Sequence, residues 1–203
     1  MQVTVVGIAG GSGSGKSTLA HAVLERTQPH SVALSFDSYY KDQCHLSRAA
    51  RRRVNYDHPD SLDVERFRGD LAMLKAGHTI ASPVYDFSAD TRSEAIALID
   101  PAPVVVVEGI LLFVFDAVCD LIDLRVFVDV PEEIRTERRV ARDVAERGRT
   151  RAQALAQIDR TVRPMHGEFV QPSAERAHIT IDGTAETGAS VATLTGVLSS
   201  PVV

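Results

Sequence analysis

The chain has 203 residues, of which 44% are hydrophobic and 24% are charged. This composition is ordinary for a globular protein, and the length fits one α/β domain with a full hydrophobic core. The formal charge of −5 argues against a nucleic-acid-binding surface, because such surfaces are basic. The N-terminal apolar run ends within nine residues and has no basic leader, which predicts neither a signal peptide nor a membrane partner.

The two cysteines, Cys44 and Cys119, have no spacing typical of a metal site or a redox pair. We therefore expect two ordinary thiols and a reducing, cytoplasmic setting. Only 3 of the 22 basic residues are lysine, so arginine supplies nearly all the positive charge. The places where arginines gather are therefore informative.

The stretch from Val3 to Thr18 contains the strongest motif. A β-branched apolar run predicts a buried strand, and a helix is expected to follow from Thr18 to Leu24. The loop between them has the pattern G-x-x-x-x-G-K-[ST], met by Gly10, Gly15, Lys16 and Ser17. A plain Gly-Ser surface turn is the alternative, but the strand and helix on either side favour a phosphate-binding loop.

Each residue type in this loop has a task if the ligand is a nucleoside triphosphate. Backbone N–H groups of the glycine-rich segment and the positive end of the helix dipole would surround the α- and β-phosphates. Lys16 would reach the β- and γ-phosphates, and the Ser17 hydroxyl would bind Mg²⁺. The expected nucleotide-binding residues are Gly10, Gly11, Ser12, Gly13, Ser14, Gly15, Lys16, Ser17 and Thr18.

Strands and helices alternate along the rest of the chain, which predicts a parallel sheet covered on both faces. Further strands are expected at 32–36, 104–109, 124–130 and 178–181, and helices at 46–53, 64–75, from 131, at 152–162 and at the C-terminus. The 104–109 run is apolar on both faces, which predicts a central strand. Short runs at 79–81, 83–87 and 95–99 predict a small β-hairpin insertion.

The predicted fold class is therefore a three-layer α/β/α P-loop fold with a five-stranded parallel sheet. One domain would span residues 1–203, with the β insertion at about 78–99 and an arginine-rich lid at about 138–152. The lid prediction rests on i, i+3, i+4, i+7 spacing, which places four arginines on one helix face. These are Arg135, Arg138, Arg139 and Arg142, and Arg147 and Arg149 follow. A solvated basic face is the other interpretation of this pattern.

Two carboxylates follow predicted strands at the edge of the sheet where the phosphate loop lies. Ligands bind beyond the carboxyl ends of parallel strands, so Asp37, Glu108 and the loop should meet in one crevice. Glu108 would hold Mg²⁺ together with Ser17, and Asp37 would accept a hydroxyl proton. A solvated strand-end acid and an Asx turn are the plainer interpretations of Glu108 and Asp37.

Seven further motifs resemble the uridine kinase (uridine–cytidine kinase) family, in the same order and with similar spacing over nearly the whole chain. They are Ser35 to Asp42, Asn55 to Pro59, Pro83 to Phe87, Val107 to Leu111, Arg139 with Arg142-Asp143, Glu146 to Arg149, and Thr161 to Met165. The resemblance implies phosphorylation of a pyrimidine ribonucleoside at its 5′-hydroxyl, with ATP or GTP as donor, in nucleotide salvage. It also implies a homo-oligomer, specifically a homotetramer.

The resemblance also implies roles for individual residues. Asp37 would be the catalytic base, acting with Lys16 and Arg139. Asp57 and Arg142 would hold the ribose 2′- and 3′-hydroxyls, with Gln157 nearby. The sugar and base would be enclosed by Tyr40, Tyr56, Tyr85 and Phe87, and the nucleotide and the transferring phosphoryl would be served by Arg139, Arg147 and Arg149.

Asp90 departs from the family pattern. Many members carry a histidine at this position, where it contacts the edge of the pyrimidine that distinguishes uracil from cytosine. An ionised carboxylate accepts hydrogen bonds but donates none, so it suits the exocyclic amine of cytosine rather than the keto oxygen of uracil. We expect a preference for cytidine, unless Asp90 points to solvent or the base pocket has been remodelled for another acceptor.

Two other functions remain open from the sequence. A related kinase could act on a sugar phosphate, as phosphoribulokinase does, although the aromatic residues Tyr56, Tyr85 and Phe87 favour a base. A nucleotide-binding module without a small acceptor is the third interpretation. Asp37 and the Asp57–Arg142 pair argue against it, because a pure binder does not need them.

Overall fold

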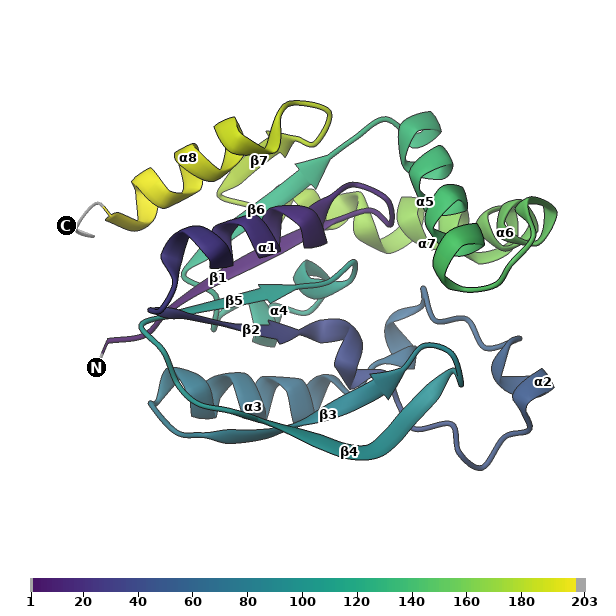
Figure 1. Cartoon of the computed structure of the whole chain (residues 1–203), viewed down its shortest axis with the longest axis horizontal. Helices are drawn as coiled ribbons and strands as arrows, with labels where there is room; N and C mark the ends of the chain where they lie inside the picture. The colour runs from purple at the N-terminus through teal and green to yellow at the C-terminus, as the bar shows by residue number, and fades with distance from the viewer. Residues whose placement is uncertain (1, 200–203) are drawn as a thin grey trace.

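The main sheet of the computed structural model, which describes residues 2–199, has five parallel strands in the order β2-β5-β1-β6-β7. Figure 1 shows the sheet running across the molecule. The strands are β1 (Thr4–Gly10), β2 (Ser31–Ser35), β5 (Val104–Glu108), β6 (Leu124–Asp129) and β7 (Ile179–Asp182). The predicted five-stranded parallel sheet is confirmed. β1 occupies the centre, and β5, which was expected there, is the interior strand beside it.

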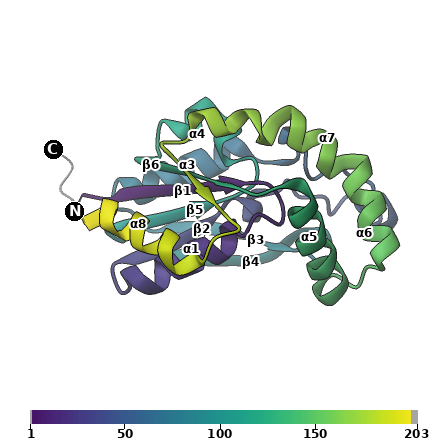
Figure 2. The same ribbon diagram turned by 90° about the horizontal axis from the view of Figure 1, so that it is seen from above.

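Alternate residues of β1 face two separate apolar cores. Val5 packs with α3 (Val64–Lys75) and α4 (Asp116–Cys119), whereas Val6 packs with α1 (Lys16–Thr27) and α8 (Thr187–Ser199). Figure 2 shows α1 and α8 on one side of the sheet and α3 and α4 on the other. The three-layer α/β/α prediction is therefore confirmed. No helix among residues 2–199 has the length and apolar character that a membrane crossing demands.

The β insertion is a two-stranded antiparallel hairpin. Its strands are β3 (Ile80–Asp86) and β4 (Thr91–Ile99), and they form a sheet of their own beside α3. Both strands are longer than expected, since β3 runs through Pro83 with a register shift between Pro83 and Tyr85. The irregularity at this point lets the strand continue past the proline.

The helices α5 (Glu132–Glu146), α6 (Arg151–Gln157) and α7 (Arg163–Met165) extend beyond one end of the sheet. Pro164 was expected to bound this segment, but the helical path continues through it. The N–H of Arg163 bonds the carbonyl of Ile158, five residues back, and such wide turns tolerate the missing proline donor. The wide turns are 158–162 and 166–170.

The remaining helical segments are short. α2 covers only Arg48–Arg51, because the Ser47 side chain caps it two residues later than the pattern suggested. α3 matches its predicted range of 64–75, with the Asp63 side chain accepting the Arg66 N–H and Gly77 following at φ 86°. The 3₁₀ turns are Phe36–Tyr39, Pro59–Ser61, Leu112–Val114 and Pro172–Arg176.

Candidate phosphoryl-transfer site

The loop between β1 and α1 has the geometry of an anion cradle. Gly13 and Gly15 adopt φ values of 84° and 91°. A Cβ at Gly13 would lie 2.3 Å from the carbonyl oxygen of Arg135, so this position excludes any side chain. The loop ends at the N-terminus of α1, and Lys16, the first residue of that helix, is buried. Backbone donors, helix dipole and ammonium group therefore converge on one place.

A cavity of about 400 Å³ lies over this loop. It is lined by the loop and the start of α1, by arginines of α5 and by the segment that follows β7. Gly183 closes one side, where a Cβ would lie 2.6 Å from the Ser14 carbonyl oxygen. Arg138 donates to the Gly183 carbonyl at 3.1 Å and so connects α5 to this wall. The cavity is large enough for a nucleotide.

Glu108 ends β5 beside the phosphate loop. The Ser17 hydroxyl donates to Glu108 Oε2 at 3.1 Å, and the Ser35 hydroxyl lies 3.4 Å from Oε1. Hydroxyl and carboxylate oxygens are the ligands that Mg²⁺ prefers, usually with one or two carboxylates and the substrate phosphates. Because their oxygens lie together at the phosphate loop, Ser17 and Glu108 are the residues that would hold Mg²⁺. Among residues 2–199, no group of three acidic, histidine or cysteine side chains has metal-ligand geometry.

Asp37 follows β2 and keeps partial contact with solvent. Burial and the neighbouring negative charge of Glu108 raise the pKa of its carboxyl group to about 6, while Lys16, Arg147 and Arg142 act in the opposite direction. Glu108, Lys16 and the two arginines come from three separate segments, and all lie close enough to Asp37 to affect its pKa. A carboxylate with a pKa near 6 can both accept and release a proton near neutral pH.

Arg139 connects the phosphate loop to a buried acid. Its Nη1 donates to the Ser12 hydroxyl at 2.7 Å and lies 3.6 Å from Asp57 Oδ1. The other oxygen of Asp57 accepts a hydrogen bond of 2.9 Å from Thr161, whose hydroxyl also donates to the Gln157 carbonyl oxygen at 3.2 Å. Arg139 is thus a guanidinium beside Asp57, while Arg142, which is expected to hold the ribose together with Asp57, lies 3.1 Å from Asp143 Oδ1.

The four predicted aromatic residues form one cluster. The Tyr40 ring lies 5.5 Å from Tyr56 and 5.3 Å from Tyr85 between centroids, and Phe87 lies 5.1 Å from Tyr85. Burial raises the pKa of Tyr40, and the Asp37 and Asp57 carboxylates add to the shift. Tyr40 therefore marks the end of the cluster that faces the acids and the phosphate loop.

Asp90 lies at the other end of this cluster, in the β3–β4 turn. Its backbone is left-handed, with φ 53°, and its carbonyl oxygen accepts a hydrogen bond of 3.0 Å from the Tyr56 hydroxyl. Burial raises the pKa of the Tyr85 hydroxyl, and Tyr56 and the Asp90 carboxylate contribute further. Burial is the main cause at both hydroxyls, and the Asp90 carboxylate lies close enough to raise the pKa of Tyr56 and Tyr85 further.

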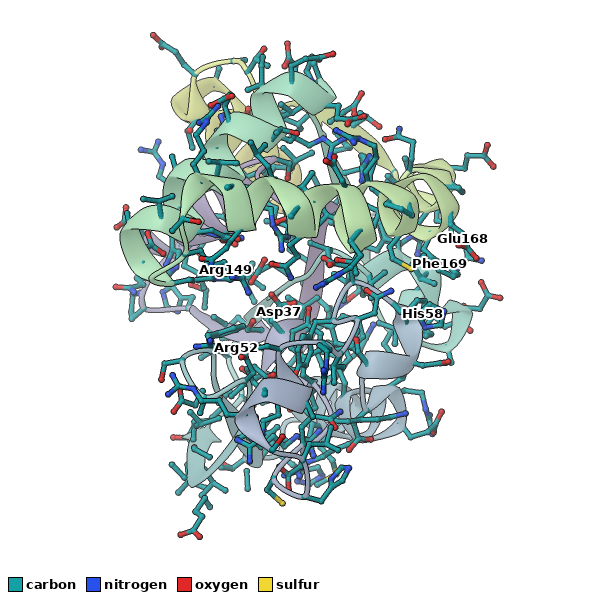
Figure 3. All side chains as sticks on the ribbon, turned by 90° about the vertical axis from the view of Figure 1, so that its right-hand side faces the viewer. Asp37, Arg52, His58, Arg149, Glu168 and Phe169 are labelled. Carbon is teal, nitrogen blue, oxygen red and sulfur yellow. The ribbon has the colours of Figure 1, made fainter. Side chains whose placement is uncertain are left out.

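The arginines predicted to form one face divide into separate groups. Arg135 donates to the Val130 carbonyl and packs beneath Gly11, which is a structural position. Arg138 points to Gly183 instead. The others gather around Asp143, and they are Arg139, Arg142, Arg147 and Arg149. Figure 3 views the end of the molecule where these segments meet and labels Arg149, from the α5–α6 connection, together with Asp37.

Sequence reasoning did not assign roles to Asp143 or Thr161, although both lie in the quoted motifs. Asp143 lies four residues after Arg139 on the same helix, a spacing that favours an ion pair. Thr161 has no such signal, because its partner Asp57 is 104 residues away in the chain. Only the fold brings that hydroxyl to the acid.

Comparisons with known proteins show the family of this chain. The model of the Phosphoribulokinase / Uridine kinase family matches residues 5–189. A uridine kinase from Staphylococcus epidermidis is 42% identical over 181 residues, covering 89% of this chain and 87% of that protein. A uridine kinase from Lactobacillus johnsonii is 40% identical over 193 residues, covering 94% and 92%. Phosphoribulokinase from Rhodobacter spheroides has a similar fold, with a TM-score of 0.67 at 13% identity over 91% of this chain and 73% of that one.

Proposed function

Since this chain belongs to the phosphoribulokinase/uridine kinase family, we propose that it transfers the terminal phosphoryl group of ATP or GTP to the 5′-hydroxyl of a pyrimidine ribonucleoside. The proposal rests on one observation about the order of the groups in the site. The phosphate loop is followed by Asp37 and Asp57, and these are followed by the aromatic cluster that ends at Asp90, so that the groups form one line. This line provides a place for phosphates, for a sugar and for a flat base, in that order. The names of the curated relatives support the same acceptor class.

The proposed reaction needs little covalent chemistry from the protein. The 5′-oxygen forms a bond to the terminal phosphorus, the bond from that phosphorus to the bridging oxygen breaks, and the hydroxyl proton passes to Asp37. The products are a nucleoside monophosphate and a nucleoside diphosphate. Lys16 and the arginines around Asp143 stabilise the charge that spreads over the transferring group. Mg²⁺ held by Ser17 and Glu108 would neutralise part of the charge on the phosphate oxygens.

The ribose is held by the buried polar groups near the loop. Asp57 accepts hydrogen bonds from a sugar diol, and Arg139, whose Nη1 is 3.6 Å from Asp57 Oδ1, holds that carboxylate in place. Holding the sugar here places the 5′-hydroxyl between Asp37 and the phosphate loop. Such positioning is a large part of the barrier reduction in phosphoryl transfer.

The base end of the site favours cytosine. The Asp90 carboxylate accepts a hydrogen bond from the exocyclic amine of cytosine, whereas the keto oxygen of uracil would face it acceptor to acceptor. A buried mismatch of this type costs about 1–3 kcal/mol, or roughly 5- to 150-fold in selectivity. The expected enzyme therefore prefers cytidine to uridine.

A panel of acceptors tests both levels of the proposal. Turnover of uridine or cytidine, without turnover of ribulose 5-phosphate or glycerate, would support a nucleoside kinase, and no nucleoside turnover would refute it. The ratio of kcat/KM for cytidine to that for uridine tests the preference. The matched variant Asp90→Asn can present either an amide N–H or an oxygen, so the ratio should approach one. If the kcat/KM values for cytidine and uridine were equal in the unmodified enzyme, Asp90 would have no role in base selection.

A further inference from the structure

Asp143 is a carboxylate with no solvent exposure that is surrounded by four guanidinium groups. Its Oδ2 accepts a hydrogen bond of 2.7 Å from Arg149, and its Oδ1 accepts one of 3.1 Å from Arg142. The Nε atoms of Arg139 and Arg147 each lie 3.7 Å from its oxygens. Both carboxylate oxygens are therefore engaged, and each guanidinium approaches from a different point of the chain.

The backbone of Asp143 also shapes this segment. Its carbonyl oxygen accepts the N–H groups of Arg147 at 3.3 Å and Arg149 at 3.2 Å. Gly148 between them has φ 62°, which turns the chain back toward α5. One residue thus fixes both the turn and the side chains that the turn carries.

The charges around Asp143 do not cancel. Asp57 and Asp143 pair with the four guanidinium groups, which are three-quarters buried or nearly so, and Asp37 interacts with Arg142 and Arg147. Three carboxylates against four guanidinium groups still leave an excess of positive charge. Buried charges need partners, and a polyphosphate beside the phosphate loop would supply them. The arginines need a fixed geometry to donate in pairs to phosphate oxygens, because the guanidinium is a rigid planar fork.

We propose that Asp143 is a positioning residue that aims Arg139, Arg142, Arg147 and Arg149 at the phosphates of the donor. The proposal rests on the function given above. Asp143 itself touches neither substrate nor reacting atoms, and it acts through the orientation of the guanidinium groups. The negative charge of Asp143 opposes the binding of an anion, so Asp143 can favour phosphate binding only by orienting the arginines.

Charge neutralisation and positioning predict opposite changes in tripolyphosphate affinity when Asp143 is replaced. If Asp143 only neutralises charge, the Asp143→Asn variant leaves the pocket more positive and binds inorganic tripolyphosphate more tightly. If Asp143 positions the arginines, the same variant binds tripolyphosphate more weakly, by roughly 10-fold, and kcat falls by about 100-fold. Calorimetric titration of the full chain with tripolyphosphate measures the dissociation constant directly and requires no turnover. Unchanged or tighter binding would overturn the proposal.

Glu137→Gln is the matched control. Glu137 lies on the same helix and pairs with Arg151 at 2.8 Å, and both side chains are exposed. The variant also removes one negative charge from α5, but outside the arginine group. Its dissociation constant for tripolyphosphate should stay within about 2-fold, because exposed charge pairs contribute little.

A second variant covers the case in which Asp143→Asn does not fold. Arg149→Lys keeps the positive charge on a side chain that is 26% exposed, but an ammonium lacks the planar fork that Asp143 orients. Weaker tripolyphosphate binding is expected again, and unchanged binding would overturn the proposal. If Asp143→Asn and Arg149→Lys both bind tripolyphosphate more weakly but no nucleoside is turned over, the proposed function fails and the positioning role stands.

Discussion

The guanidinium of Arg147 lies over the ring of Phe87, 5.4 Å from the ring centroid. Arg147 follows α5, whereas Phe87 follows β3 in the hairpin, so the contact joins the predicted phosphate-binding segment to the predicted base-binding segment. Asp143 Oδ1 lies 3.7 Å from the Nε atom of the same arginine. Arg147 therefore contacts both segments of the proposed site.

Replacing Phe87 should loosen this contact. Phe87→Leu keeps an apolar side chain but loses the aromatic face, and a cation–π contact at a partly exposed site contributes about 0.5–1 kcal/mol. The KM for the nucleoside should rise by about 2- to 5-fold. The dissociation constant for tripolyphosphate should rise by about 2-fold at most, because Asp143 still holds Arg147. Phe87→Tyr, which keeps the ring face, is the control. A Phe87→Leu enzyme with unaltered KM would show that the contact has no part in binding.

The raised pKa of Asp37 predicts how activity depends on pH. A general base must be ionised, and burial together with Glu108 raises the pKa of Asp37 to about 6. The kcat/KM for the nucleoside should therefore increase with pH and level off above about 6. Bound Mg²⁺ beside Glu108 offsets that acid's charge, so higher Mg²⁺ concentrations should move the midpoint to lower pH. A profile that is flat from pH 5 to pH 8 at low Mg²⁺ would contradict the raised pKa of Asp37.

The same shift predicts a gain in stability when the acid is removed. The folded-state pKa of Asp37 lies above its unfolded value, so its ionisation costs stability as pH rises from about 4 to 6. Asp37→Asn should lower kcat by about 10²- to 10⁴-fold. It should also raise Tm at pH 7.5 by about 2–4 °C, the shift that accompanies roughly 1 kcal/mol. The gain should vanish near pH 4.

Asp42 provides the control of opposite sign for this measurement. Hydrogen bonds from Cys44 and Thr91 lower its pKa to about 2, so its ionisation stabilises the folded protein above pH 4. Asp42→Asn should therefore lower Tm at pH 7.5, and the difference should shrink as pH falls toward 2. Both predictions are tested by measuring the Tm of the two variants and of the unmodified protein between pH 2 and pH 7.5 in the presence of a metal chelator. A lower Tm for Asp37→Asn than for the unmodified protein at pH 7.5 would contradict the raised pKa of Asp37.

The strands, the hairpin and α3 follow from local patterns, and so they could be predicted from the sequence. The phosphate loop is equally local, since its glycines, Lys16 and Ser17 are contiguous. The arginine helix shows where such reasoning ends. Its spacing predicted one common face, but Arg135 is used to support the loop from below while Arg139 contacts Ser12 and Asp57. Long side chains reach different partners from one face, and only the packed fold decides which.

Thr161 belongs to a sequence motif, but its contact with Asp57 could not be predicted from the sequence, and this contact gives the last prediction. The Thr161 hydroxyl donates to the buried Asp57 carboxylate at 2.9 Å. Thr161→Val keeps the shape of the side chain but removes this donor, and an unmet hydrogen bond to a buried charged group costs about 1.5–3 kcal/mol. Because Asp57 is proposed to hold the ribose, the KM for the nucleoside should rise by about 10-fold or more, while tripolyphosphate binding should stay unchanged. Thr193→Val, which removes an exposed hydroxyl on α8 that donates to the Ala189 carbonyl, is the control and should leave both constants unaltered. A Thr161→Val enzyme that binds nucleoside normally would place the ribose away from Asp57.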